Sequence, residues 1–233
     1  MTLLLRAVPW TGWALGAILV LAAAGCAPTH AGRTVGRGVL QAEGSLGGPL
    51  VRNLGPPIPV PNVPVGARYG LTDRLDVSGH VNLLPLVAGG FLAMDGGLTL
   101  GLVRHKGRIG PNLATSAGFV LLTDFDTAAR VGPLVDMAAS YTFDWLTPFV
   151  GLEIIPDPRG GRVVTDVFAG LEADFGRTSV SLAGVWFHPS FDVSASPVEY
   201  VSLDNRGALG VLLGVKVRWN MLDLRCKEGR DGR

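Results

Sequence analysis

Long stretches in which apolar and polar residues alternate are the feature that most constrains the fold of this 233-residue chain. From Leu75 to Leu83, every odd position holds Leu, Val or Gly, and the even positions hold Asp, Ser, His and Asn. Successive side chains of a β-strand point to opposite faces of a sheet, so this pattern predicts a strand with one apolar face. Beyond residue 37, no helical periodicity lasts longer than a turn or two, and we expect an all-β fold.

The alternation recurs along the chain and predicts an antiparallel up-and-down β-barrel of about ten strands, within a range of about eight to ten. The predicted strands are 38–47, 62–70, 75–84, 89–103, 112–122, 130–143, 146–155, 162–175, 178–188 and 206–219. Many of them are longer than the usual strand of a soluble sheet and close to what a tilted strand needs to cross a bilayer. The sequence therefore predicts a barrel over residues 38–219 and favours a transmembrane one.

The two faces of the predicted strands suit lipid outside and a polar interior. In 206–219, for example, Leu209, Val211 and Leu213 share one face, and Lys216 and Arg218 lie on the other. By the same alternation, the charged side chains expected to face the lumen are Arg68, Asp76, His80, Asp95, Arg130, Asp136, Glu153, Asp166, Glu172, Asp174, Lys216 and Arg218. Because both signs of charge occur, we expect a paired and mostly closed interior, with a passage for small solutes as the alternative.

The predicted connections alternate between short and long. Those at 72–73, 144–145 and 176–177 are short turns, whereas 48–61 and 189–205 are long. Transmembrane barrels have short periplasmic turns and longer outer loops, and an even number of strands returns both termini to the periplasm. Aromatic residues also gather near the predicted strand ends, as in an interfacial belt: Tyr69, Phe91, Tyr141, Phe143, Phe175, Trp186, Phe187 and Trp219.

The N-terminal segment 1–25 has the layout of a secretory signal peptide. Arg6 precedes the apolar stretch 13–21, and small residues lead to Cys26. The run from Leu21 to Cys26 resembles a bacterial lipobox, and the resemblance implies that Cys26 receives a diacylglycerol and becomes the first residue after cleavage. The alternative is an ordinary signal peptide cut near Ala24.

Two polar segments flank the predicted barrel. Residues 26–37 are small and polar and are predicted to be a lipidated tether, and residues 220–233 form a polar C-terminal tail. If Cys26 carries lipid, Cys226 has no partner for an intramolecular disulfide.

Two further motifs carry a resemblance to Gram-negative outer-membrane β-barrel proteins. The segment 68–77 (RYGLTDRLDV) resembles their strand–turn–strand unit, in which Thr and Asp form the tight turn. The segment 214–219 (GVKVRW) resembles the C-terminal signal read by the barrel assembly machinery, although 14 residues follow Trp219. The resemblance implies outer-membrane lipid, lipoprotein processing enzymes and the assembly machinery as partners.

Charge and composition exclude several other classes of function. Without residues 1–25 the chain has 19 basic and 19 acidic residues, so no nucleic-acid partner is implied. The four histidines lie at scattered positions of the predicted barrel, and no paired-cysteine or HExxH pattern occurs, so no metal or other cofactor is expected.

One weak catalytic pattern is present. His188 and Ser190, followed by Glu199, are similar to the His-x-Ser and downstream Glu of outer-membrane lipid A deacylases. That resemblance implies that the Ser is a nucleophile activated by the His, and that the Glu orients the His. The Asn that follows the Ser in that family is replaced here by Phe191.

The sequence thus predicts an outer-membrane β-barrel lipoprotein, anchored through Cys26, with a structural, adhesive or limited-permeability role. The alternative is a soluble periplasmic β-barrel that is tethered by the same lipid and binds an apolar ligand inside. These two predictions differ in whether the apolar strand face contacts lipid. A lipid A deacylase-like hydrolase is a remote third possibility.

Overall fold

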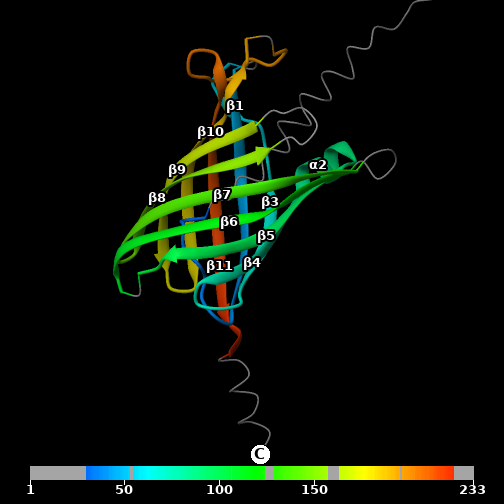
Figure 1. The fold of residues 1–233 in the computed structure, drawn as a ribbon. Coiled ribbons are helices and arrows are strands. Elements are labelled where there is room, and N and C mark those ends of the chain that lie inside the picture. Colours follow the sequence, from blue (N-terminus) through cyan, green and yellow to red (C-terminus); the bar gives the residue numbers. More distant parts are fainter. Residues whose placement is uncertain are drawn as a thin grey trace, which may run out of the picture.

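The computed structural model describes residues 30–52, 55–105, 107–123, 129–156, 163–194 and 196–222. Ten strands form one closed antiparallel sheet in chain order, because β11 pairs back onto β1 (Figure 1). These strands are β1 (Val39–Val51), β3 (Pro64–Gly70), β4 (Leu75–Asn82), β5 (Leu92–Val103), β6 (Ile109–Thr123), β7 (Ala129–Phe143), β8 (Leu146–Pro156), β9 (Val163–Phe175), β10 (Thr178–Asp192) and β11 (Arg206–Asn220). The predicted all-β up-and-down barrel is confirmed. The predicted signal peptide, Cys26 and Cys226 lie outside the described residues.

The seam between β1 and β11 closes the barrel. Its register runs from Val39 opposite Asn220 to Pro49 opposite Gly210. On its other side, β1 pairs with β3 from Leu40 opposite Tyr69 to Gly44 opposite Val65, and the short β2 (Ile58–Pro59) pairs with the end of β1. Closure leaves no unpaired sheet edge among the barrel strands, which removes the usual site of edge-to-edge aggregation.

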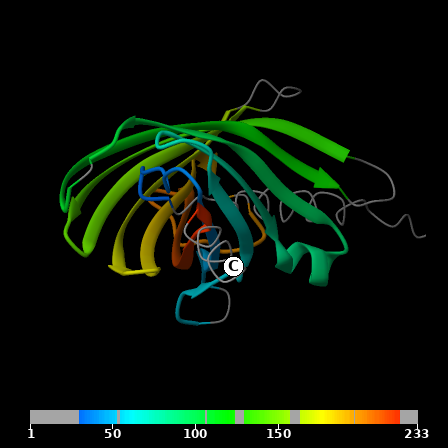
Figure 2. The same cartoon turned by 90° about the horizontal axis from the view of Figure 1, so that it is seen from below.

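The two ends of the barrel differ in their connections. One end, here called the terminal end, holds the start of β1, the end of β11 and the turns β3–β4, β5–β6, β7–β8 and β9–β10. Seen from this end, the strands β5 to β8 form a broad curved wall (Figure 2). Two of the turns have two residues and begin with a positive φ, at Asp144 and Gly176, as tight hairpins require.

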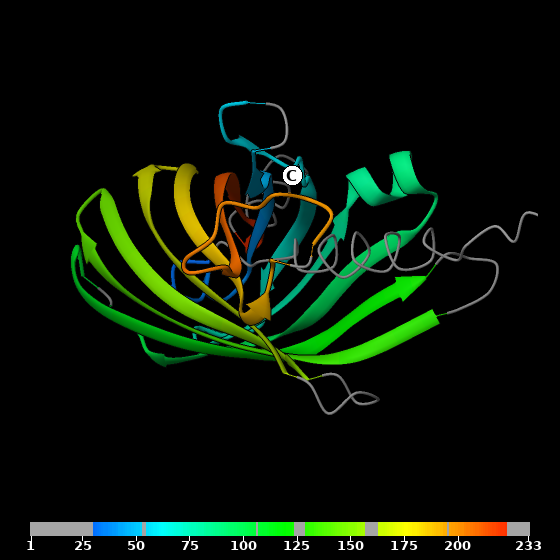
Figure 3. The same cartoon turned by 90° about the horizontal axis from the view of Figure 1, so that it is seen from above.

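The opposite end carries the longer connections. The β10–β11 connection lies across this end (Figure 3), and its Tyr200 packs against the apolar cluster inside. Helix α2 (Leu83–Gly89) joins β4 to β5, where the sequence predicted strand up to residue 84 and again from residue 89. The Asn82 side chain caps α2 by accepting a hydrogen bond from the Leu84 backbone N–H at 3.3 Å. Among the described helical residues, none belongs to a helix with the length and hydropathy needed to span a membrane.

The barrel is apolar outside and polar inside. On β11, the outward Val211, Leu213 and Val215 are between 40% and 49% exposed, whereas the inward Lys216 is 4% exposed. The same division holds round the barrel, where the exposed strand residues include Val65, Val77, Leu98, Leu100, Phe119, Val135, Met137, Val150, Val167, Leu171 and Leu182. This arrangement is the reverse of a water-soluble barrel, which buries its apolar face.

A small apolar cluster fills part of the lumen beside β8 to β11. It contains Phe149, Phe168, Phe187, Leu212 and several alanines. The register places Phe149 opposite Gly170 and Phe168 opposite Gly151. A Cβ at Gly151 would lie 2.3 Å from Cζ of Phe168, so the two rings need the space that these glycines leave.

Candidate functional site

The chain ahead of β1 lies inside the barrel. His30, Ala31 and Thr34 are only 2–6% exposed, and residues 30–37 run from the middle of the lumen to the terminal end, where β1 begins. We call residues 30–37 the lumen segment. Residues 26–37 were predicted to be a tether, but its described part, residues 30–37, is packed against the inner wall.

Hydrogen bonds hold the lumen segment at both ends. The Gly32 backbone N–H donates to Nδ1 of His30 at 3.2 Å, so Nε2 carries the proton that is donated to Oδ1 of Asp136 at 2.7 Å. Nearer the terminal end, the Thr34 hydroxyl donates to the Asp73 carbonyl at 2.9 Å, and the Val35 N–H donates to Oδ2 of Asp76 at 2.8 Å. These contacts join the segment to β4, to β7 and to the β3–β4 turn.

Gly32 allows the lumen segment to approach β7 closely. Its φ is +59°, and an added Cβ would lie 2.4 Å from the carbonyl oxygen of Ala138. Both the backbone conformation and the space therefore require glycine at this position.

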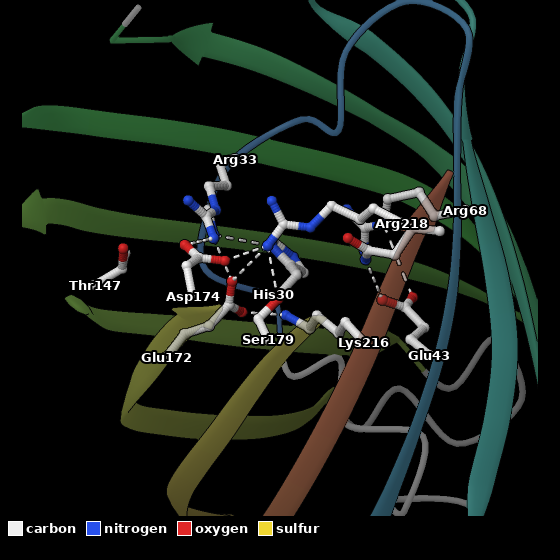
Figure 4. A network of polar contacts seen from close by, with 12 residues as sticks. His30, Arg33, Glu43, Arg68, Thr147, Glu172, Asp174, Ser179, Lys216 and Arg218 are labelled. Atoms are coloured by element: carbon white, nitrogen blue, oxygen red, sulfur yellow. Dashed lines mark hydrogen bonds and ion pairs between the residues drawn. The ribbon is translucent and has the colours of Figure 1, made fainter. Parts of the chain in front are cut away.

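A network of ion pairs links the lumen segment to β9 and β11 (Figure 4). Arg33 Nη2 donates to Glu172 and, at 2.6 Å, to Oδ2 of Asp174. Lys216 donates to the second oxygen of Glu172, and Arg218 donates to Asp174. Three cations thus share two carboxylates, of which Glu172 is 1% exposed. Buried charges need such pairing, because burial removes their hydration.

A second network joins β1, β4 and β5. The His80 ring faces Glu43 with Nε2 and, at 2.7 Å, Asp95 with Nδ1. Only a protonated imidazole donates from both nitrogens, so this geometry places a positive charge between two carboxylates. Gln41 donates to the other oxygen of Glu43 at 2.7 Å.

A row of carboxyl groups crosses the wall at mid-depth. Asp136, Glu153 and Asp166 are direct neighbours on β7, β8 and β9. Asp136 is held by His30, and Asp166 accepts a hydrogen bond from the His188 backbone N–H at 2.9 Å, whereas neither oxygen of Glu153 has a hydrogen-bond partner within the described part of the chain. No group of three or more His, Cys, Asp or Glu among the described residues is placed to hold a metal ion.

Most of the charges predicted to face the lumen do lie there. Arg68, Asp76, Asp95, Asp136, Glu153, Asp166, Glu172 and Lys216 are buried, and His80, Asp174 and Arg218 are partly buried in the networks. Arg130 is exposed at the far end of β7. The prediction omitted His30, Arg33, Gln41 and Glu43. Alternation within 38–47 could have located Gln41 and Glu43, but nothing local indicates that His30 and Arg33 dock in the lumen.

The three residues of the weak catalytic pattern do not form a triad. His188 has a φ of +50° beside a register shift in β10, and its Nδ1 lies 3.1 Å from Oδ1 of Asp166. Neither Ser190 nor Glu199 bonds to the His188 ring, and both are exposed. The His188 ring lies beside Asp166 on the inner wall, whereas Ser190 lies further along β10 and Glu199 lies in the β10–β11 connection.

Comparisons with known proteins yield only distant likenesses. No protein-family model matches the sequence, and no curated protein is detectably similar. Among solved structures, the chain is similar to Ail of Yersinia pestis, solved in complex with the heparin analogue sucrose octasulfate, at 13% identity and a TM-score of 0.28, with 78% of this chain and 99% of that chain covered. It is also similar to OmpT of Vibrio cholerae, at 10% identity and a TM-score of 0.33, with 78% of this chain and 97% of that chain covered. The similarity to OpdQ of Pseudomonas aeruginosa has 11% identity and a TM-score of 0.33, with 78% of this chain and 58% of that chain covered. Sequence identities and TM-scores this low support no conclusion about the family or the function of this chain.

The first prediction concerns Gly32. In a background with Cys26→Ser and Cys226→Ser, a Thr34→Cys thiol is expected to react slowly with an aqueous maleimide. Adding Gly32→Val is expected to raise this rate at least about tenfold, because the clash and the strained φ displace the lumen segment.

Gly90→Val is the matched control, since Gly90 also has a positive φ, of +67°, but no atom within 4 Å of its Cβ position. Equal labelling rates with Gly32→Val and Gly90→Val would contradict tight docking of the segment.

The second prediction concerns Glu172. Glu172→Gln removes the charge that Arg33 and Lys216 share, and is expected to lower the free energy of unfolding by about 3 kcal/mol. The measurement is denaturant unfolding followed by tryptophan fluorescence. The exposed pair of Arg108 and Asp144, whose atoms are 3.6 Å apart, provides the control: Asp144→Asn should cost under about 1 kcal/mol. Similar losses in both variants would refute the central role of Glu172.

Proposed function

We propose that this protein is an integral outer-membrane β-barrel with a closed lumen, and that its role is structural, adhesive or of limited permeability. The observation that carries the proposal is the inverted distribution of side chains, with apolar residues on the exposed face of the strands and charged residues inside. A lipid bilayer is the environment in which such an outer face is stable.

Strand length supports a bilayer span. The strands β6, β7, β10 and β11 each contain 15 residues. A tilted strand needs about 9–11 residues to cross the hydrocarbon core, so these strands are long enough to cross it. Each barrel strand is hydrogen-bonded to a neighbour on both sides around the closed sheet, which is the arrangement that a bilayer favours.

Exposed aromatic residues support the same reading and suggest an orientation. Tyr69, Tyr141, Phe143 and Phe175 lie exposed near the terminal end, and the rings of Tyr141 and Phe143 are 4.7 Å apart. Aromatic side chains at this depth suit the headgroup region. Together with the short turns, they favour a periplasmic location for the terminal end.

The filled lumen argues against a general diffusion pore. The lumen segment, the Glu172 network and the Glu43 network occupy the described interior. A soluble barrel that binds an apolar ligand fits less well, because it would expose the apolar belt to water and offer its ligand an interior rich in charges.

The lipid anchor belongs to the proposal as an additional element. Cys26 is four positions before His30, and four extended residues span at most about 14 Å. Acyl chains on Cys26 would therefore start close to the lumen segment, so acylation and docking of His30 constrain each other.

The third prediction tests the bilayer span. Leu213→Arg, at the middle of β11, is expected to make folding into phospholipid vesicles less favourable by about 2–4 kcal/mol, because it places a cation among lipid tails. Leu203→Arg is the control, since Leu203 is equally exposed, at 48%, but lies in the β10–β11 connection. In a water-soluble barrel both changes would stay within about 0.5 kcal/mol, and that outcome would overturn the proposal.

The fourth prediction tests lipidation. Cells that express Cys26→Ser are expected to yield a protein without labelled palmitate, because the thiol that accepts the diacylglycerol is missing. Cys226→Ser provides the control and should keep the label. Unlabelled wild-type protein would rule out the anchor while leaving the proposed bilayer span intact.

A further inference from the structure

Arg68 is a buried cation for which the described part of the chain supplies no hydrogen-bond acceptor. It lies on β3 and is 3% exposed. Its guanidinium group has five N–H donors, yet within the described ranges no atom accepts a hydrogen bond from it, and the buried Nε is unpartnered. Its ion pair with Glu43 is long, with 3.8 Å between Nε of Arg68 and Oε1 of Glu43. Leaving a buried guanidinium without acceptors is costly, so the site calls for an acceptor.

Arg68 faces a cavity near the terminal end of the lumen. The cavity has a volume of about 190 Å³, and its charged lining consists mainly of Arg33, Arg68, Arg104, Lys216 and Arg218. These side chains come from the lumen segment, from β3, from the β5–β6 turn and from β11, and Figure 4 shows four of them around the same space. Among the described residues of the lining, Glu172 is the one carboxylate.

Three carboxylates of the two ion-pair networks are already engaged by other groups. Glu172 accepts from Arg33 and Lys216, and Asp174 accepts from Arg33 and Arg218. Glu43 is held by His80 and Gln41. None of these three carboxylates therefore accepts a hydrogen bond from Arg68, which lines the cavity and has only the long ion pair with Glu43 among them.

We propose that this cavity binds a small phosphate-class oxyanion, with Arg68 as its central ligand. The planar fork of an arginine matches two oxygens of a phosphate group, and several cations around one space favour an ion with more than one negative charge. The amide and hydroxyl groups of Gln41, Asn112 and Thr142 also line the cavity and add neutral donors. A cavity of this volume accommodates inorganic phosphate or the phosphate group of a small solute.

The bound anion connects the lumen segment to the barrel wall. Arg33 and His30 contribute to the lining from the segment, and Arg68, Lys216 and Arg218 contribute from the wall. A complete site exists only while the segment is docked, so the anion stabilises the docked form by mass action. The inference goes beyond the proposed function, because it does not depend on whether the barrel crosses a membrane.

The experiment is calorimetric titration of the full chain, folded in detergent micelles, with inorganic phosphate at constant ionic strength. Wild-type protein is expected to show one saturable site. Arg68→Met should weaken binding at least about tenfold, since charge-assisted hydrogen bonds are lost, and Arg68→Lys should weaken it less. Arg130→Met is the matched control, because Arg130 is exposed at the opposite end of the barrel, and should bind as wild type does.

The outcomes separate the possible readings. A heat-dependent shift on an SDS gel first establishes that each variant is folded. Absence of a saturable site in folded wild-type protein, unchanged binding by folded Arg68→Met, or equal competition by chloride would each overturn the inference. Glycerol 3-phosphate serves as the second probe: binding of both probes supports a site for phosphomonoesters, and binding of phosphate alone supports a site for the inorganic ion.

Discussion

The constraint on which the structure depends is that a closed sheet with strict side-chain alternation sends half of its side chains into a narrow interior. In this chain the inward half carries the charges and the outward half the large aliphatic residues, as Lys216 beside Val215 illustrates. A charge in such an interior has little water to solvate it, so another side chain must supply its partner. The lumen networks follow from closure combined with this sequence.

The barrel strands do not by themselves supply partners for all the charged side chains on their inner faces. The inner faces of β7 and β9 carry Asp136, Glu172 and Asp174, and each of the three contacts a cationic or ring nitrogen of the lumen segment. The segment also donates a backbone N–H to Asp76 on β4. Its fit is therefore electrostatic as well as steric, and Gly32 makes the steric part possible by letting the backbone approach Ala138 closely.

The sequence predicts what depends on local alternation and misses what depends on distant contacts. The last strand was predicted at 206–219 and is observed at 206–220, and its inward and outward faces agree with the observed burial. Docking of the lumen segment was not predicted, because His30 and Asp136 are 106 positions apart and no periodicity connects them. The alternation pattern also fails where a strand is irregular, as at His188. It predicts which face of the strand a residue occupies but not how far along the barrel the residue lies, so it did not predict that Arg130 is exposed at the end of β7.

The charges are separated along the lumen as well as paired. Asp136, Glu153 and Asp166 form a row at mid-depth, whereas arginines and a lysine surround the cavity at the terminal end. The lumen segment spans both regions, with His30 at the acidic row and Arg33 at the basic cavity. Withdrawing the segment would leave Asp136, Glu172 and Asp174 with fewer partners at once. The segment therefore acts as part of the folded interior, and opening the lumen requires water or ions to replace several charged contacts together.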